Sequence, residues 1–362
     1  MLLSMILLFF VSSVYANTEE SAKAEKKDGN KEGKFNAGKM IMEHISDAHE
    51  WHIMEIGETP VSIPLPVILF DDGKLDIFMS SEFHHGTQSY HGYKIEYEGK
   101  NKGKIVCVNE DGTVNKAAAL PLDFSITKNV LSLFIGIIIL CLVFISIARR
   151  YIKNPNSAPK GLQSMLEFVI LFVRDDIVRP CIGEKKYKKF MPFLLTVFFF
   201  IFFNNLLGLI PFFPGGANLT GNIAVTMVLA VFVFVTTCFI AKKPYWIHII
   251  NAPGVPWWLK IPLPLMPIVE IMGVFTKPFV LMVRLFANIT AGHIIILGFI
   301  SLIFIFGNMS AGLGYGISIL SVGFSIFMGF LELLVAFLQA YVFTLLSAIY
   351  FGMAMEEHHT EH

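Results

Sequence analysis

The stretch FTKPFVLMVRLFANITAGHIIILGF, residues Phe275–Phe299, places an arginine in the middle of a long apolar segment. Apolar residues continue for several helical turns on both sides of Arg284. An arginine at the centre of a membrane helix costs roughly 2.5–3.5 kcal/mol on insertion scales, so intramembrane arginines are usually functional. We therefore predict a membrane helix in which Arg284 has a functional role. The alternative is an arginine that is paired only structurally inside a helix bundle.

Polar residues recur every seven positions around this arginine. Glu270, Lys277 and Arg284 share one stripe of a helix with about 100° per residue, and Asn288 lies on the same stripe. A second apolar segment has a seven-residue polar stripe of its own: Ser318, Ser325, Glu332 and Gln339. The two segments are therefore predicted to be membrane helices with matching polar faces.

Glycines and turn formers separate the two segments, in the run GNMSAGLG at Gly307–Gly314. This composition predicts a turn. A chain folded back about Ala311–Gly312 brings two polar pairs into register, Arg284 with Gln339 and His293 with Glu332. We expect each pair to meet across an antiparallel hairpin.

In these residues the chain resembles subunit a of the rotary F-type ATP synthase. LMVRLFANITAGHIIIL and ELLVAFLQAYVFTLLSAIYFGMAMEEH look like the two C-terminal helices of that family, and the resemblance extends over residues 120–358. It is most specific at Arg284, Asn288, His293, Glu332 and Gln339. Many bacterial members have glutamate at the position of His293 and histidine at that of Glu332. This chain has the two exchanged, as mitochondrial members do.

The resemblance implies a non-catalytic, proton-conducting stator subunit of the ATP synthase membrane sector, without a cofactor. In that family the arginine faces a rotating ring of c subunits, and two offset half-channels bring protons to the ring carboxylates. The implied partners are the c-ring, b-type peripheral stalk subunits and the rest of the synthase, all in a lipid bilayer. Ion flow through the subunit would be coupled to ATP synthesis on other chains.

The side-chain chemistry fits these roles. Arginine effectively never loses its proton, so Arg284 can act as a fixed charge between two half-channels. Histidine titrates near neutral pH, so His293 with Glu332 would form the outer route. Glu270 lies toward the other end of its helix and would serve the inner route. Gln339 would position the guanidinium group.

The whole chain has the composition of a polytopic membrane protein. Of its 362 residues 54% are hydrophobic, the mean hydropathy is +0.63 and the formal net charge is zero. The zero net charge argues against nucleic acid as a partner. The sequence has no GxxxxGK[ST] run, so nucleotide chemistry is expected on other chains.

Five apolar segments predict membrane helices, at about residues 129–148, 191–210, 223–240, 265–306 and 315–355. An amphipathic segment at residues 161–178 predicts a helix along the cytoplasmic interface. At 1.5 Å per residue the last two membrane helices are about 60 Å long, twice the ~30 Å hydrocarbon core, so they must be strongly tilted or broken. Asn204 and Asn205 are candidates to line the outer half-channel, and interfacial capping is the alternative.

Basic residues set the expected orientation. Arg149, Arg150 and Lys153 follow the first membrane segment and indicate a cytoplasmic end by the positive-inside rule. The N-terminal segment would then lie outside the cytoplasm and the C-terminus inside. A bacterial inner membrane fits this topology.

The first third of the chain differs from the rest, because it does not have the pattern of membrane-spanning helices. Met1–Ala16 predicts a secretory signal peptide, either cleaved or retained as an anchor. Residues 17–122 predict a disordered charged linker followed by a small β-rich domain of four or five strands. Its histidines lack the spacing of a zinc motif, so we expect surface histidines and no metal site. The segment shows no convergent polar cluster, and we expect it to be accessory.

A self-contained proton-coupled secondary transporter is the alternative function. The absence of an internal inverted repeat argues against it. An intramembrane metalloprotease would need a His-Glu-x-x-His motif, which the sequence lacks. Both H⁺ and Na⁺ fit the pattern, because in the family the choice of ion lies in the ring.

Overall fold

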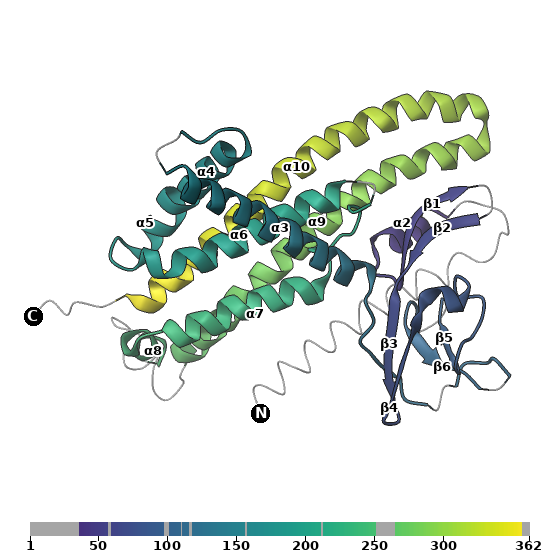
Figure 1. Ribbon diagram of the computed structural model, residues 1–362, viewed down its shortest axis with the longest axis horizontal. Helices are drawn as coiled ribbons and strands as arrows, with labels where there is room; N and C mark the ends of the chain where they lie inside the picture. The colour runs from purple at the N-terminus through teal and green to yellow at the C-terminus, as the bar shows by residue number, and fades with distance from the viewer. Residues whose placement is uncertain are drawn as a thin grey trace, which may run out of the picture.

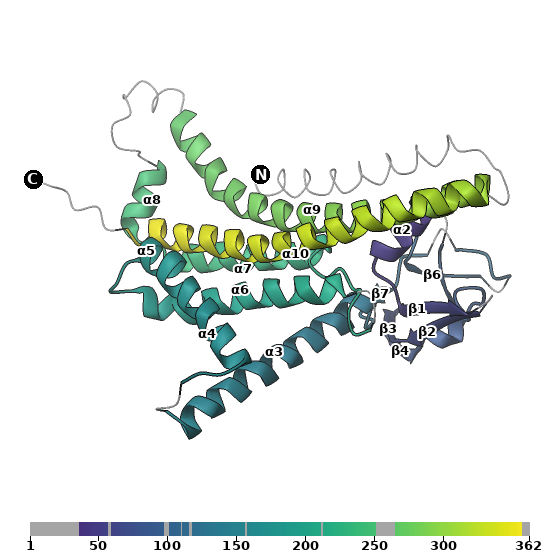
Figure 2. The same ribbon diagram turned by 90° about the horizontal axis from the view of Figure 1, so that it is seen from above.

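The computed structural model describes residues 36–56, 59–97, 101–109, 111–115, 118–155, 158–210, 213–250 and 265–356. The predicted signal peptide at residues 1–16 and most of the predicted linker lie outside this range. The described chain has two parts, a helical bundle and a smaller β-rich part at one end of it (Figures 1 and 2).

Within the described residues, five helices are long and apolar enough to cross a membrane. They are α3 (Lys128–Lys153), α6 (Tyr187–Leu209), α7 (Ile223–Ile240), α9 (Leu265–Met309) and α10 (Ala311–Met355). A short helix, α8 (Lys243–Ile250), follows α7. Together with the β-rich part, these helices confirm the predicted fold class, an all-α membrane protein with a small β-rich N-terminal domain.

α9 and α10 form a hairpin whose turn is much shorter than predicted. The sequence predicts a turn over Gly307–Gly314, whereas only Ser310 separates the two helices. A Cβ atom added to Gly314 would lie 2.8 Å from the Cα of Gly307. The glycines therefore allow the two helices to approach closely, as small residues do in membrane helix pairs, instead of ending them. The first half of α9, which contains Pro278, bends away from α10 (Figure 2).

The predicted interfacial segment consists of three successive helical pieces. They are α4 (Leu162–Phe172), the π-helical η2 (Val173–Val178) and α5 (Arg179–Ile182). Its apolar face is buried in the bundle, while the carboxylate of Asp175 accepts hydrogen bonds from Arg174 and Arg179 on the exposed face. The amphipathic pattern is thus as predicted, but it does not reveal the π-helical turns.

α6 lies between α3 and α10 and positions much of the core. Phe199 of α6 packs edge-on against Phe144 of α3, with 4.8 Å between ring centroids. Phe190 packs against Phe351 of α10, with 5.6 Å between centroids. α7 packs on α9. These aromatic contacts hold α6 and its terminal asparagines against the hairpin.

The N-terminal part begins with α2 (Ala37–Ile45), a helix that the sequence analysis did not predict. Seven strands follow among the described residues: β1 (Glu50–Ile56), β2 (Thr59–Pro64), β3 (Pro66–Asp71), β4 (Lys74–Met79), β5 (Tyr93–Ile95), β6 (Ile105–Cys107) and β7 (Leu122–Asp123). They form three antiparallel sheets, β1-β2, β4-β3-β7 and β5-β6, and η1 (Ser80–Phe83) follows β4. The prediction of four or five strands is too low, and β7, with only two residues, is too short for an alternating pattern to reveal it.

The N-terminal part is joined to the bundle at the start of α3. The carboxylate of Asp47 accepts hydrogen bonds from the backbone N–H of Asn129, at 3.1 Å, and from the hydroxyl of Thr127, at 2.8 Å. α2 packs against α9. Trp51 meets Phe213 edge-on, with 5.2 Å between ring centroids. The N-terminal part therefore lies at the same end of the bundle as the α9–α10 turn (Figure 2).

Candidate functional site

Arg284 lies on an exposed face of α9, together with Asn288 one turn further on. The opposite face of the same turns is buried at Leu281, Leu285 and Ile289. No hydrogen bond or ion pair joins Arg284 to any other residue that the structure describes. In a bilayer, an exposed arginine of this kind needs a partner outside the chain, because lipid tails cannot solvate its charge.

The predicted pair of Arg284 and Gln339 does not form a hydrogen bond within the described residues. Gln339 is 7% exposed and lies on the buried face of α10, whereas Arg284 is exposed. Arg284 lies close enough to Tyr350 of α10 for its charge to act on that residue. Lys277 lies seven residues before Arg284 on α9, and its ammonium group is 5.6 Å from the centre of the Tyr350 ring.

His293 and Glu332 meet inside the hairpin. The Nδ1 atom of His293 lies 3.2 Å from the Oε1 atom of Glu332, and their side chains are 18% and 3% exposed. The two groups are within ion-pair distance, yet neither oxygen of Glu332 has a hydrogen bond in the described structure. A buried carboxylate is costly unless it is paired or protonated. Glu332 therefore depends on the charge of His293 or on a bound proton.

A glycine makes this meeting possible. A Cβ atom on Gly292 would lie 2.9 Å from Oε1 and 3.0 Å from Cδ of Glu332. Any side chain at this position of α9 would therefore push the carboxylate away. The stacked rings of Phe299 and Phe324, with 5.3 Å between centroids, continue the same helix pairing toward the turn.

Asn205 connects α6 to the hairpin close to Glu332. Its amide nitrogen donates to the carbonyl of Ala336, one turn beyond Glu332, at 3.3 Å. Its amide oxygen accepts from the hydroxyl of Thr220 at 2.6 Å. Asn205 and Thr220 are both almost fully buried, so this polar connection lies within the bundle.

Asn204, the other predicted asparagine, faces α3. Its amide nitrogen donates to the carbonyl of Phe200 at 2.7 Å, but its amide oxygen is buried without a hydrogen bond in the described structure. A Cβ atom on Gly136 of α3 would lie 2.6 Å from that oxygen. Both asparagines are thus buried, and neither caps a helix at the surface.

Several polar residues near this region were missed in the sequence analysis. They are Lys128, Asn129 and Ser132 on α3, and Asn218, Thr220 and Thr226 after α6, all buried. Gly208, near the end of α6, lies close to His293. A Cβ atom added to Gly208 would be 3.8 Å from Nε2 of His293. The run ANLTGN, at residues 217–222 between α6 and α7, is the sequence signal that could have indicated some of them.

Glu270 lies on the other side of Arg284 along α9. It is half-buried. Along the one continuous helix α9 the order of the three residues is Glu270, Arg284, His293. At 1.5 Å per residue, Glu270 is about 21 Å from Arg284 along the axis, and His293 is about 13 Å away in the opposite direction. The helix therefore spaces three polar positions over about 35 Å of its axis, slightly more than the ~30 Å thickness of a hydrocarbon core.

The histidines of the N-terminal part form no metal site among the described residues. His44, His52, His84, His85 and His91 are exposed, as predicted. His49 is an exception to the expected surface location, because it is 8% exposed and lies 2.8 Å from a carboxylate oxygen of Asp123. Burial alone would raise the pKa of Asp123, but the hydrogen bonds with His49 and Ser125 outweigh it and lower that pKa.

Comparisons with known proteins match both parts of the chain. A family model described as "ATP synthase A chain" matches residues 130–352, and one described as a domain of unknown function (DUF8433) matches residues 40–124. ATP synthase subunit a of Chloroherpeton thalassium is 44% identical over 247 residues, which cover 66% of this chain and 70% of that protein.

Two further relatives agree. ATP synthase subunit a 2 of Chlorobaculum tepidum is 47% identical over 239 residues, which cover 64% of each chain. ATP synthase subunit a of Myxococcus xanthus is 41% identical over 249 residues, which cover 67% of this chain and 77% of that protein. Because the first family model covers nearly all of the helical bundle, this chain belongs to the ATP synthase subunit a family and is a multi-pass membrane subunit of that complex.

Proposed function

We propose that the chain is the proton-channel stator of the synthase membrane sector. It provides two offset half-channels to a rotating c-ring, and Arg284 is the barrier between them. The observation that supports this most directly is the hairpin itself. One face of α9 exposes an arginine, while the interior holds His293 beside Glu332 only nine residues further along.

The exposed arginine face fits contact with a ring of apolar helices. Val283 and Ala287 are exposed beside Arg284 and are apolar, and Asn288 is a small polar neighbour one turn further on. A ring carboxylate that reaches this face meets a fixed positive charge and has to be ionised, because arginine keeps its proton. A protonated carboxyl group can instead enter lipid at low cost. This difference makes Arg284 the place where the ring must release its proton.

The outer half-channel runs through His293 and Glu332, with Asn204 and Asn205 in its wall. The hydrogen bonds of Asn205 to Thr220 and to the backbone of α10 give it a fixed orientation next to this route. Glu270 serves the inner half-channel. Asn288 and Gln339 line the approach to Arg284, one on the exposed face and one on the buried face.

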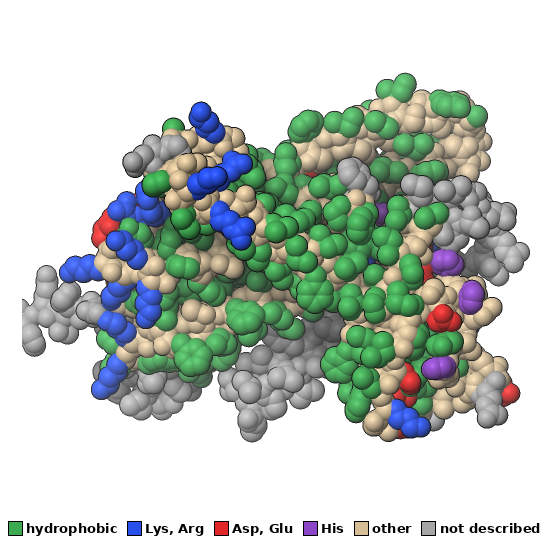
Figure 3. Space-filling model, viewed as in Figure 1, with side chains coloured by type: hydrophobic (Ala, Val, Ile, Leu, Met, Phe, Trp, Pro, Cys, Tyr) green, Lys and Arg blue, Asp and Glu red, His purple; other side chains and the backbone are tan. Residues whose placement is uncertain are grey.

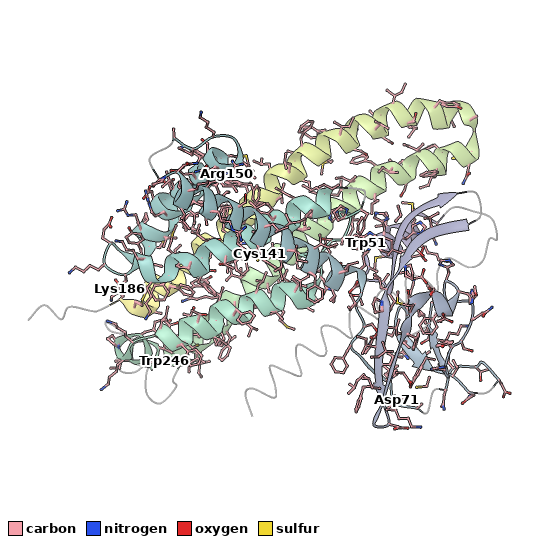
Figure 4. The ribbon with its side chains drawn as sticks, viewed as in Figure 1. Trp51, Asp71, Cys141, Arg150, Lys186 and Trp246 are labelled. Carbon is pink, nitrogen blue, oxygen red and sulfur yellow. The ribbon has the colours of Figure 1, made fainter. Side chains whose placement is uncertain are left out.

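The charges at the two ends of the molecule support the expected orientation. Lysines and arginines gather over α4, α5 and the nearby helix ends, whereas acidic residues and histidines lie over the N-terminal part (Figure 3). Arg150 and Lys186 lie at one end and Trp51 at the other (Figure 4). By the positive-inside rule the basic end is cytoplasmic, which puts the N-terminal part outside and the end of α10 in the cytoplasm of a bacterial cell.

The partners in this proposal are the c-ring, b-type peripheral stalk subunits, the rest of the synthase and the lipid bilayer. Such a subunit binds no cofactor and does not catalyse ATP chemistry by itself.

Passive proton flux in membrane vesicles stripped of the catalytic head tests the proposal. We expect Arg284→Ala to conduct protons without ring rotation, seen as a leak that persists when the ring carboxylate is blocked by a carbodiimide. Arg149→Ala is the matched control, since it removes an exposed arginine at the end of α3. Normal coupled ATP synthesis in Arg284→Ala would contradict the stator assignment.

A further inference from the structure

The junction between α2 and α3 lies at the end of the bundle that bears the N-terminal part (Figure 2). α2 packs directly against α9, the helix that bears His293. The ammonium group of Lys128, the first residue of α3, donates to the backbone carbonyl of His44 in the last turn of α2 at 3.1 Å. His44 and Lys128 lie close enough to His293 for their charges to act on it.

Buried polar atoms without a hydrogen bond in the described structure lie on α3, on α6 and in the segment after α6. They are Oδ1 of Asn129, Oδ1 of Asn204 and Nδ2 of Asn218, each without a hydrogen bond in the described structure and each on a side chain that is at most 6% exposed. Buried polar groups of this kind normally bind ordered water. Asn129 lies two turns before Gly136, which contacts Asn204.

We propose that the α2–α3 junction forms the outer mouth of the route to His293, with His44 exchanging protons with water at its surface and Lys128 holding α2 over the opening. This inference rests on the proposed stator function. It also replaces the expectation that the N-terminal part is accessory, because that part supplies both the cover of α9 and a titratable group near His293.

The surroundings of His44 suit proton exchange. His44 is exposed and is therefore open to water. The protein packed around part of its ring lowers its pKa, and the nearby charges of Lys128 and His52 lower it further. An imidazole has two ring nitrogens and can accept a proton from water and pass one on. Asp47 is held by its hydrogen bonds to α3 and fixes the backbone of the junction.

The test compares two histidines of the same part of the chain in the assembled complex. His44→Asn removes the imidazole at the proposed mouth, and His84→Asn removes an exposed imidazole at the end of η1. His84 has a φ of 45°, a conformation that asparagine tolerates. We expect a severalfold loss of proton flux per assembled complex in His44→Asn and none in His84→Asn. Millimolar imidazole in the outer medium should restore the flux, which a purely structural loss would not allow.

A labelling experiment provides a second measurement. The four native cysteines are replaced by serine, and His44→Cys or His84→Cys is added. A bulky, membrane-impermeant maleimide applied from outside should block the imidazole-restored flux of His44→Cys and leave the flux of His84→Cys unchanged. If His44→Asn conducts like His84→Asn and the label has no effect, the mouth lies elsewhere. His293→Ala would still slow the flux in that case, so the stator proposal is tested separately.

Discussion

Two ionisable residues of the same hairpin have opposite environments, one exposed and one buried. Arg284 is exposed on α9 without a partner in the described chain, whereas Glu332 is buried on α10 beside His293. A group that never loses its proton can be presented to another molecule as a permanent charge. A carboxylate that exchanges protons has to be sheltered near a group that can share them. In the proposed function, Arg284 is the outward-facing fixed charge and His293 with Glu332 is the inward-facing proton relay.

The largest effect is expected at the outward-facing charge. Arg284→Lys keeps the positive charge but replaces a planar, permanently protonated group with a compact ammonium group that can titrate. We expect coupled ATP synthesis to be lost, although the complex assembles. ATP synthesis by reconstituted complexes measures this, with Arg149→Lys as the control. Full activity in Arg284→Lys would show that charge alone is sufficient and that the guanidinium geometry is not needed.

The second effect concerns the inward-facing pair. Under the proposed function, His293→Ala and Glu332→Ala should each slow proton uptake from the outer side without a leak, because Arg284 would still separate the half-channels. The native groups lie 3.2 Å apart, and exchanging the two residues, as His293→Glu with Glu332→His, restores both side-chain types in reversed positions. We expect this double variant to conduct better than either alanine variant, which indicates coupling between the sites.

Flux per assembled complex, measured at several outer pH values, distinguishes conduction from assembly. If both alanine variants conduct normally once assembled, the pair only packs the hairpin.

A smaller effect is expected from the glycine that admits Glu332. Gly292→Ala should displace the carboxylate from His293, because a Cβ atom there would lie 2.9 Å from Oε1. Gly298→Ala is a matched control on the same helix, since a Cβ atom at that position meets nothing within 4 Å. We expect reduced flux for the first variant and unchanged flux for the second, which gains about 1 kcal/mol in helix propensity. Equal flux in the two variants would show that proton conduction does not depend on the position of the Glu332 carboxylate.

The smallest effect belongs to the histidine–carboxylate pair outside the bundle. Because the folded-state pKa of Asp123 is lowered, its pairing with His49 stabilises the protein above the ordinary carboxyl pKa. This stability is lost as the pH falls through the folded-state value. Asp123→Asn should therefore destabilise the N-terminal part by about 1 kcal/mol at neutral pH and by less at about pH 3. Hydrogen exchange of β3 and β7 amides in the whole chain measures the difference, and a pH-independent effect would exclude the ion pair as its cause.

The sequence by itself determined the membrane helices, the hairpin and the meeting of His293 with Glu332. Hydrophobic length and seven-residue polar spacing are local properties of a chain. Once the position of the turn is known, it fixes which residues of the two helices lie opposite each other. The same reasoning could not place Arg284 and Gln339, because which face of each helix is buried depends on α6 and α7.

Only the tertiary structure showed the short turn at Ser310 and the close contact of Gly307 with Gly314. It also showed the hydrogen bonds of Asn205 to α10 and of Lys128 to α2. These features arise from contacts between segments far apart in the chain. A glycine looks the same in a sequence whether it ends a helix or admits a neighbouring one, and only the packing partner decides which role it has.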